Sequence, residues 1–145
     1  LRAQAPLSLL MVDIDHFKQY NDLRGHFEGD DCIRAVAVAL DAVVSRASDL
    51  VARYGGEEFA ILLPETDAEA AAQVAESCLR AVAELAIAHG GSPAGEPVSI
   101  SIGVCTLAVT ADATPATLIT RADQALYQAK RDGRNCIRQY SVSSP

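Results

Sequence analysis

The fold of this chain is decided by the stretch Leu50-Val-Ala-Arg-Tyr-Gly-Gly-Glu-Glu-Phe-Ala-Ile-Leu-Leu63, in which two short β-rich runs flank a pair of glycines. Glycine pairs between strands are typical of hairpin turns, because glycine tolerates a positive φ. We therefore expect strands at 50–54 and 59–63 to pair as a hairpin, with the carboxylates of Glu57 and Glu58 at its tip.

On the N-terminal side of the hairpin, the sequence predicts one strand and two helices. Ser8–Ile14 is a continuous apolar run that ends in acidic residues, which is typical of a strand buried on both faces. We expect Asp15 to cap a short helix at 16–23, and a polar loop at 26–30 to lead into a longer helix. One face of that longer helix carries apolar residues at helical spacing: Ile33, Val36, Ala37, Leu40 and Val44.

On the C-terminal side, helices and strands alternate. The sequence predicts a helix from residue 66 or 67 to the glycines at 90–91, a strand at 98–107, a helix from 114 to about 132 and a last strand at 136–140. Thr114 followed by Pro115 is typical of a cap and a first helical position. The inward face of the helix after the hairpin would consist of Val74, Cys78, Val82 and Leu85.

The order of these elements is β α α β β α β α β, in which a hairpin is embedded among strands separated by helices. This order predicts an α/β (α+β) fold with a ferredoxin-like βαββαβ core, whose central mixed or antiparallel sheet is surrounded by helices. A chain of 145 residues has room for a single domain, 1–145, and none for a second. The fold class alone assigns no function.

Composition narrows the class of ligand. Half of the residues are hydrophobic and 21% are charged, which excludes a disordered chain. The net charge of -7 repels polyanions, so we expect no nucleic-acid partner and no direct membrane contact. A phosphate ligand must therefore be held by local cations or by a metal ion.

The cysteine pattern and the length of the apolar runs indicate in which cellular compartment the protein is expected. The four cysteines include no CxxC pair, which argues against a zinc site and a disulfide framework and favours the reducing cytoplasm. The longest apolar runs are too short to span a bilayer. Because Leu1 is not a methionine and a strand is predicted almost at once, we expect a domain cut from a longer protein, which could itself be membrane-anchored.

Acidic side chains gather where the first strand and the hairpin tip are expected to meet. Asp13 and Asp15 end that strand, and Glu57 and Glu58 lie on the turn. Oxygen ligands that converge from a strand end and a turn suit Mg²⁺, with substrate phosphates completing its coordination. The alternative is that Asp15 is only a helix cap, Asp13 a solvated strand end and the glutamates an ordinary acidic turn.

Three basic residues, Lys18, Lys130 and Arg134, could hold a triphosphate against this acidic background. Lys130 would also complement the dipole of the last helix without any ligand. Spacing alone does not decide between these interpretations.

Two polar pairs complete the set of candidates. Asn21 and Asp30 offer an amide and a carboxylate, which together can read the hydrogen-bonding edge of guanine, although Asp30 could equally cap the second helix. Arg46 and Asp49 form an RxxD pair before the hairpin. Taken alone, this pair would only satisfy carbonyl groups and start a turn.

Taken together, these residues resemble the GGDEF domain family of diguanylate cyclases, in the variant spelled GGEEF. The resemblance covers most of the chain and rests on short motifs in the family's order: Asp13-Ile-Asp-His-Phe-Lys18, Asn21-Asp22, Gly25-His26, Gly29-Asp30, Arg53-Tyr-Gly-Gly-Glu-Glu-Phe59, Ser101-Ile-Gly103, Ala122-Asp-Gln-Ala-Leu-Tyr127 and Lys130 through Gly133-Arg134-Asn135. It implies a fold similar to the palm of nucleotide cyclases. It also implies that two such domains, each with one GTP, pair and form cyclic di-GMP with release of two pyrophosphates.

The resemblance further implies a role for each candidate residue. Asp13 and Glu57, with the backbone carbonyl of Ile14, would bind two Mg²⁺ or Mn²⁺ ions, and the catalytic set would be Asp13, Glu57 and Glu58. Glu58 would assist the metal site or help to deprotonate the attacking 3′-hydroxyl. Lys18, Lys130 and Arg134 would hold the phosphates of GTP, Asn21 and Asp30 would read guanine, and Gly55 and Gly56 would let the backbone approach the nucleotide.

Arg46 and Asp49 stand at the spacing of the family's inhibitory site, which implies feedback binding of cyclic di-GMP. The chain departs from the family at its start, where Leu1-Arg-Ala-Gln4 stands in place of a segment resembling DxLTGLxNRR. A sensor domain, usual in this family, would have to come from the parent chain. A second hypothesis is a catalytically weak module that binds GTP or cyclic di-GMP and regulates a partner; the pair Glu57 and Glu58 favours catalysis, since a pure receptor needs no metal ligands.

Overall fold

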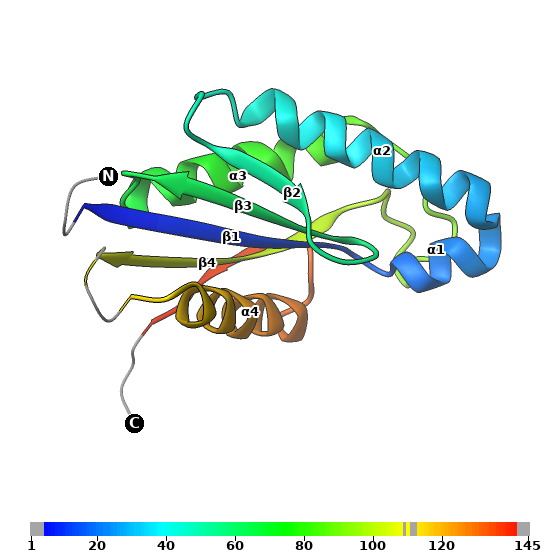
Figure 1. Ribbon diagram of the computed structural model, residues 1–145. Coiled ribbons are helices and arrows are strands. Elements are labelled where there is room, and N and C mark those ends of the chain that lie inside the picture. Colours follow the sequence, from blue (N-terminus) through cyan, green and yellow to red (C-terminus); the bar gives the residue numbers. More distant parts are fainter. Residues whose placement is uncertain (1–4, 109, 111–112, 142–145) are drawn as a thin grey trace.

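The structure is a computed structural model that describes residues 5–108, 110 and 113–141, so the opening segment 1–4 lies outside the described residues. Within the described residues, strands and helices follow the predicted order (Figure 1): β1 Pro6–Ile14, α1 Phe17–Arg24, α2 His26–Val43, β2 Leu50–Arg53, β3 Glu58–Pro64, α3 Ala68–Glu84, β4 Ile100–Ala108, α4 Pro115–Arg131 and β5 Ile137–Gln139.

The strands form a five-stranded sheet in the order β2-β3-β1-β4-β5. β1 pairs antiparallel with both β3 and β4, β2 pairs antiparallel with β3, and β5 joins β4 in parallel. The first four strands thus have the order of a ferredoxin-like βαββαβ unit, and α4 and β5 extend it beyond β4. The predicted fold class is confirmed.

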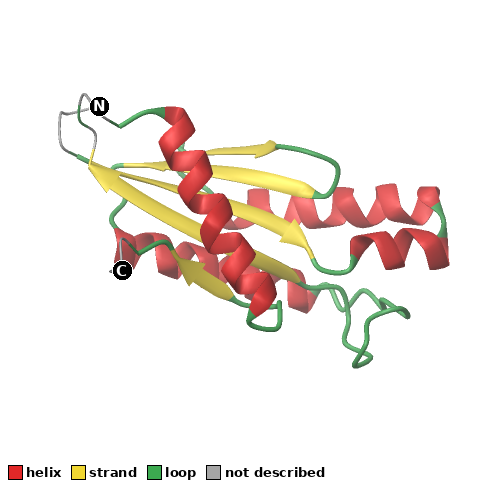
Figure 2. Cartoon of the chain, turned by 90° about the horizontal axis from the view of Figure 1, so that it is seen from below, coloured by secondary structure: helices red, strands yellow, loops and turns green. Residues whose placement is uncertain are grey.

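Helices cover both faces of the sheet (Figure 1). Because side chains alternate along a strand, Leu10 and Val12 of β1 pack with the core under α2 and α3, whereas Leu9 and Met11 pack against α4. Figure 2 shows α4 crossing the sheet on its own face. Asp13 lies two residues after Met11 and four after Leu9, so its side chain points to the same face of the sheet, which α4 covers.

The first two helices begin at other residues than the sequence predicts. His16 precedes α1 in a left-handed conformation, with φ of 53°, and no side chain caps the helix; Asp15 is therefore not its cap. α2 begins directly at His26, so the predicted polar loop is helical, and Asp30 lies inside the helix instead of capping it. Gly25, with φ of 88°, makes the break between the helices in a single residue, which is why no loop is needed.

Three further predictions are wrong. α3 ends at Glu84, well before the glycines at 90–91, and Leu85 follows it with 37% of its surface exposed instead of facing inward. The chain turns away from the helix at Ala86, whose φ is 52°. Neither Gly55 nor Gly56 adopts a positive φ, so turn chirality is not the reason for glycine at the hairpin.

Gly103 of β4 allows α4 to lie close against the sheet. It pairs with Met11 of β1, and a Cβ at this position would collide with the backbone of Ala122 and Leu126 in α4. Because the colliding atoms belong to helix backbone, they could yield only if the helix moved. The close approach therefore fixes the end of α4, which carries Lys130.

Candidate active site

A cavity of about 160 Å³ lies where β1 ends, between the β2–β3 turn, the start of α1 and the end of α4. Among the residues that line it are all six that were expected to hold metal and phosphate: Asp13, Ile14, Lys18, Glu57, Lys130 and Arg134. Strand pairing brings them together, since Asp13 stands opposite Glu58 across β1 and β3. The strand end and the hairpin tip thus meet as the sequence predicts.

Asp13 is a buried carboxylate, with 4% of its surface exposed. Its Oδ2 forms an ion pair with Nζ of Lys130, whereas its Oδ1 is buried without a hydrogen-bond partner among the described residues. Burial raises the pKa of Asp13 to about 6; Lys130 opposes the rise, and the charges of Glu57 and Glu58 add to it. Asp13 therefore lacks part of the positive surroundings that its charged form requires.

The turn that carries Glu57 is held on both sides. The backbone N of Ile14 donates to the carbonyl of Glu57 at 3.2 Å, which ties the turn to the end of β1. The guanidinium of Arg53 folds over the turn and donates to the carbonyl of Gly56 from Nη2 at 2.7 Å and from Nε at 3.0 Å. Glu57, itself half-buried, is thus presented by a fixed backbone.

Glu58 lies beside Asp13 on the α4 face, because residues directly opposite each other in an antiparallel pair point to the same side. Burial and the nearby carboxylate of Asp123 raise the pKa of Glu58, and Lys130 opposes the rise. The pKa of Asp123 is raised as well, chiefly by burial. The carboxylates of Asp13, Glu58 and Asp123 thus share the positive charge of Lys130. This part of the site therefore carries more negative than positive charge.

The carboxylates fit a hard divalent cation. The unpartnered Oδ1 of Asp13 and the carboxylate of Glu57 belong to the same cavity, and such oxygen donors suit Mg²⁺ or Mn²⁺. Among the residues that the structure describes, no three His, Cys, Asp or Glu side chains are arranged to hold a metal by themselves. Mg²⁺ held by one or two carboxylates takes its other ligands from water and phosphate oxygens, so the protein side chains would supply only part of its coordination.

A buried histidine fixes the turn between β1 and α1. His89, 2% exposed, lies between α3 and β4. Its Nδ1 accepts from the N–H of Gly91 at 3.0 Å, so Nε2 carries the ring proton and donates to the carbonyl of His16 at 2.9 Å. The ring also meets Tyr20 edge-on, with centroids 5.3 Å apart. The start of α1, with Lys18, is thereby held beside the cavity.

The basic residues of the cavity are engaged in different ways. Lys18 is 84% exposed along its side chain and pairs with Asp22 at 3.1 Å, one turn further along α1. Exposed pairs of this kind contribute only about 0.5 kcal/mol, so Lys18 can turn to a ligand at little cost. Arg134 lines the cavity from the turn after α4, where its φ is 65°.

Asp15, expected as a cap or a member of the acidic cluster, has another role. Both of its oxygens accept hydrogen bonds: Ser99 Oγ donates to Oδ2 at 2.7 Å, Ser101 Oγ to Oδ1 at 2.6 Å, and the N–H of Asn135 to Oδ2 at 3.0 Å. The side chain is turned toward β4 and the turn after α4, and away from the helix that it was predicted to cap.

Asn21 and Asp30 do not line this cavity; they lie on α1 and α2, on either side of the break at Gly25. The Oδ1 of Asn21 is buried and has no partner in the described part of the chain, and a Cβ on Gly29 would collide with it. Asp30 is exposed on the first turns of α2. An unpartnered buried amide oxygen is costly, and a donor on a ligand would satisfy it.

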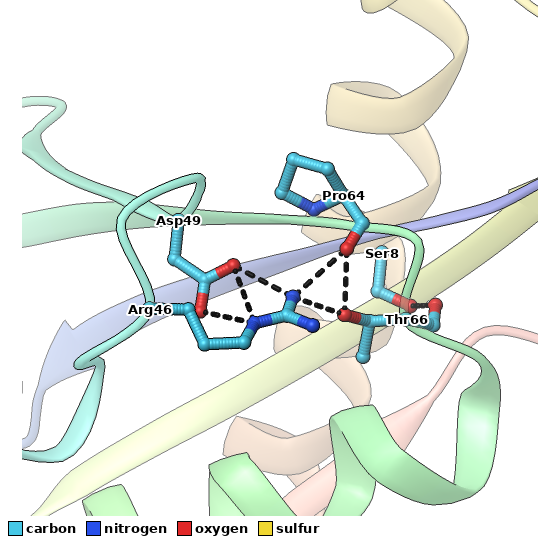
Figure 3. Close-up of polar contacts among 5 residues, drawn as sticks. All are labelled: Ser8, Arg46, Asp49, Pro64 and Thr66. Atoms are coloured by element: carbon cyan, nitrogen blue, oxygen red, sulfur yellow. Dashed lines mark hydrogen bonds and ion pairs between the residues drawn. The ribbon is translucent and has the colours of Figure 1, made fainter. Parts of the chain in front are cut away.

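Arg46 and Asp49 form a separate site in the loop between α2 and β2. Nη2 of Arg46 donates to Oδ1 of Asp49 at 2.7 Å, to the carbonyl of Pro64 at 2.8 Å and to Oγ1 of Thr66 at 2.7 Å (Figure 3). The guanidinium thus bridges this loop to the end of β3, and it does more than start a turn. Both residues line a cavity of about 310 Å³, which Glu65 also lines.

Arg53 and His89 have structural roles that were not predicted from the sequence patterns. A signal was present for Arg53, which directly precedes the turn and is long enough to reach back over the carbonyls of Gly55 and Gly56. No local signal existed for His89, since its partner His16 is 73 positions away.

The described residues include no helix with both the length and the apolar character needed to cross a membrane.

Comparison with known proteins agrees with this geometry. The family described as "Diguanylate cyclase, GGDEF domain" matches residues 1–136. Response regulator PleD of Caulobacter vibrioides is 44% identical over 134 residues, which cover 91% of this chain and 29% of that protein. Diguanylate cyclase A of Treponema denticola is 43% identical over 131 residues, which cover 90% of this chain and 34% of that protein. The chain thus spans about a third of the length of these curated relatives.

Solved structures give the same result. The active GGEEF domain of a diguanylate cyclase from Vibrio cholerae superposes with a TM-score of 0.81 at 38% identity, covering 95% of this chain and 85% of that one. The GGDEF domain of DgcB from Caulobacter crescentus, in complex with c-di-GMP, superposes with a TM-score of 0.82 at 34% identity. The match covers 93% of this chain and 78% of that one. Fold, motif order and sequence identity agree, and the chain belongs to the GGDEF domain family of diguanylate cyclases.

Proposed function

We propose that this domain is a diguanylate cyclase that condenses two GTP molecules into cyclic di-GMP and releases two pyrophosphates. The observation that carries the proposal is the cavity at the end of β1, in which carboxylates suited to a metal and cations suited to phosphate line one space. Relatives named diguanylate cyclases support it, as does a related domain in complex with c-di-GMP.

Asp13 and Glu57 would hold Mg²⁺ or Mn²⁺, two ions per site, with the carbonyl of Ile14 as a further ligand. When bound, the metal would supply positive charge to the reacting α-phosphate and to the departing pyrophosphate. Asp13 would exchange its pairing with Lys130 for the metal, and its Oδ1 would gain a partner. Lys130 would then be available for phosphate.

The remaining contacts would orient the nucleotide. Lys18, Lys130 and Arg134 line the cavity and would hold the triphosphate by charge-assisted hydrogen bonds. The buried Oδ1 of Asn21 would accept from the amino edge of guanine, and Asp30 would accept beside it. Gly55 and Gly56 would leave the turn open to the nucleotide; a Cβ on Gly56 would meet nothing within 4 Å, so the space above it is available.

The chemical step would join nucleotides held by different copies of the domain. The 3′-oxygen of one GTP forms a bond to the α-phosphorus of the other, the bond from that phosphorus to the bridging oxygen of pyrophosphate breaks, and the hydroxyl proton leaves to a base. Glu58 is the candidate base or an aid to the metal site, and its raised pKa makes it a stronger proton acceptor than an ordinary glutamate. Because the product is symmetric, two copies facing each other across a twofold axis would complete both bonds.

Arg46 and Asp49 would bind the product and restrain the enzyme. Arg46 already donates to three protein groups, so cyclic di-GMP would have to replace some of these bonds with bonds to its phosphates or guanines. The same site motivates the second candidate function, a module that binds cyclic di-GMP or GTP and regulates a partner without turnover. In either case we place the domain in the cytoplasm, where GTP is available, with a sensor domain elsewhere in the parent chain as its input.

A product assay decides between these functions. The full-length protein is incubated with GTP and Mg²⁺, and cyclic di-GMP and pyrophosphate are measured. We expect one cyclic di-GMP for every two pyrophosphates, and a rate that rises more steeply than linearly with protein concentration, because the site is divided between two chains. Absence of product from a protein that nevertheless binds cyclic di-GMP would favour the regulatory module.

A further inference from the structure

A buried hydrogen-bond network joins β1, β4 and the turn after α4. Its centre is Asp15, 4% exposed, whose Oδ2 accepts from Ser99 Oγ and from the N–H of Asn135. Its Oδ1 accepts from Ser101 Oγ at 2.6 Å, and that hydroxyl oxygen in turn accepts from the N–H of Asn135 at 3.2 Å. Asp15 also lines the candidate active site, so the network forms part of its wall.

The turn that this network holds has an unusual backbone. Gly133, Arg134 and Asn135 follow one another with φ of 114°, 65° and 51°. Such a conformation is unfavourable for arginine, whereas asparagine tolerates it better, and the strained residue persists where hydrogen bonds support the turn. The N–H of Arg134 bonds to the carbonyl of Ala129 at 3.0 Å, and the N–H of Asn135 bonds to Asp15 at 3.0 Å.

We propose that Asp15 is a positioning residue for Arg134. By accepting the N–H of Asn135, it fixes the left-handed turn that directs Arg134 toward the phosphate end of the cavity. The inference rests on the proposed function in one respect, that Arg134 binds the triphosphate. Asp15 acts through the turn, because both of its oxygens accept hydrogen bonds from protein donors.

The donors of the network suit a carboxylate at its centre. The groups that approach Asp15 are two serine hydroxyls and one backbone N–H, and all of them donate. An ionised carboxylate only accepts, so it satisfies all of these donors. An asparagine has nearly the same shape but would direct its own N–H₂ at one of them. The variant Asp15→Asn therefore keeps the shape of the side chain and changes its hydrogen bonding and its charge.

A double-mutant cycle in the full-length protein tests the proposal. Binding of a non-cleavable GTP analogue with Mg²⁺ is measured by calorimetry for the wild type, Asp15→Asn, Arg134→Ala and the double variant. We expect Asp15→Asn to weaken binding about tenfold in the wild-type background and to have almost no effect once Arg134 is alanine. Wild-type affinity of Asp15→Asn, or an equal loss in both backgrounds, would overturn the proposal.

The control separates positioning from general destabilisation. Asp67 caps α3, where its Oδ1 accepts from the N–H of Ala70 at 2.9 Å, and it does not line the cavity. Asp67→Ala should lower the unfolding temperature and leave the affinity for the analogue unchanged. If it weakened binding as much as Asp15→Asn does, a positioning role for Asp15 would be rejected.

Hydrogen exchange adds a readout that needs no nucleotide. The amides of Arg134 and Asn135 should exchange faster in Asp15→Asn than in the wild type, while those of α3 keep their rates; unchanged exchange in the turn would reject the proposal. If Asp15→Asn fails to fold, Ser101→Ala takes its place in the cycle and in the exchange experiment, because the Ser101 hydroxyl both donates to Asp15 and accepts from the N–H of Asn135. Failure of the wild type to bind the analogue would contradict the proposed function instead, and exchange would still decide the role of Asp15.

Discussion

Lys130 at the end of α4 forms an ion pair with Asp13 at the end of β1, so a cation proposed to bind phosphate neutralises a carboxylate proposed to bind metal. The pair is partly buried, since the side chain of Lys130 is 31% exposed and that of Asp13 is 5% exposed. Without a metal, the lysine partly compensates the carboxylate. Metal binding at Asp13 and the transfer of Lys130 to phosphate are therefore coupled, and each should promote the other.

The raised pKa of Asp13 makes the stability of the metal-free protein depend on pH. The pKa is about 6 in the folded chain against an ordinary 3.8, so the folded state keeps a proton that the unfolded chain releases. The contribution of Asp13 to the free energy of unfolding is greatest below pH 3.8, and it is lost as the pH rises through about 6. Between about pH 5 and pH 7.5, we expect the wild type to lose about 1 kcal/mol of unfolding free energy relative to Asp13→Asn.

Urea unfolding of both proteins in EDTA measures this difference. A difference in unfolding free energy that stays the same at both pH values would show that Asp13 does not titrate as its burial suggests.

Glu57→Gln keeps the shape of the side chain and removes the charge that a metal requires. We expect formation of cyclic di-GMP to fall about a hundredfold or more, with an unchanged unfolding transition, because the turn is held by backbone and by Arg53. Product formation is followed over a Mg²⁺ titration. Glu96→Gln, in an exposed loop, is the matched control and should behave as the wild type. Full activity of Glu57→Gln would refute the metal assignment.

Arg46→Ala should abolish binding of cyclic di-GMP at the RxxD site and release the enzyme from inhibition by its product. It should also lower the unfolding free energy by about 1–3 kcal/mol, because the side chain of Asp49, only 6% exposed, would lose its partner. Calorimetry with cyclic di-GMP and a urea titration measure the two effects.

The chain offers a matched control for this experiment. Arg34 pairs with Asp31 at 2.7 Å at the same spacing of three residues, but both side chains are more than 70% exposed. Arg34→Ala should change neither binding nor stability by a measurable amount. Equal affinity of Arg46→Ala and the wild type for cyclic di-GMP would remove Arg46 from the binding site.

Gly103→Ala should destabilise the fold, since the added Cβ would collide with the backbone of α4 at Ala122 and Leu126. We expect a loss of about 2 kcal/mol or more in urea unfolding. Gly56→Ala is the control, because an added Cβ there meets nothing within 4 Å, and its unfolding free energy should change by less than about 0.5 kcal/mol. Equal stability of the two variants would mean that α4 can move away from the sheet without cost.

The strands and the meeting of Asp13 with the hairpin could be predicted because they depend on local patterns. The apolar run Ser8–Ile14 and the β-rich runs around Gly55-Gly56 define strands by themselves, and pairing them places Asp13 opposite Glu58. The loop predicted at 26–30 is wrong, because a single glycine can end one helix and begin the next, and the polar residues after Gly25 suit a helix as well as a loop.

The true partners of Asp15 could not be predicted, because they lie far away in the sequence. An acidic residue before a helix suggests a cap, and no local pattern shows that Ser99, Ser101 and Asn135 compete for it from 84 to 120 positions away. Tertiary donors outweighed the local preference once the carboxylate was buried among them. The same holds for His89, whose role depends on how the chain after α3 returns to α1.

The hydrogen bond from Asn135 to Asp15 closes over 120 positions, which has a consequence for protein synthesis. During translation, the strand with the metal carboxylate leaves the ribosome long before the turn with Arg134 does, and such distant contacts are among the last to form. A nascent chain can therefore assemble the hairpin and β1 while its nucleotide site still lacks a wall. An incomplete copy, whether stalled or truncated before this turn, would lack Arg134 and one wall of the proposed nucleotide site.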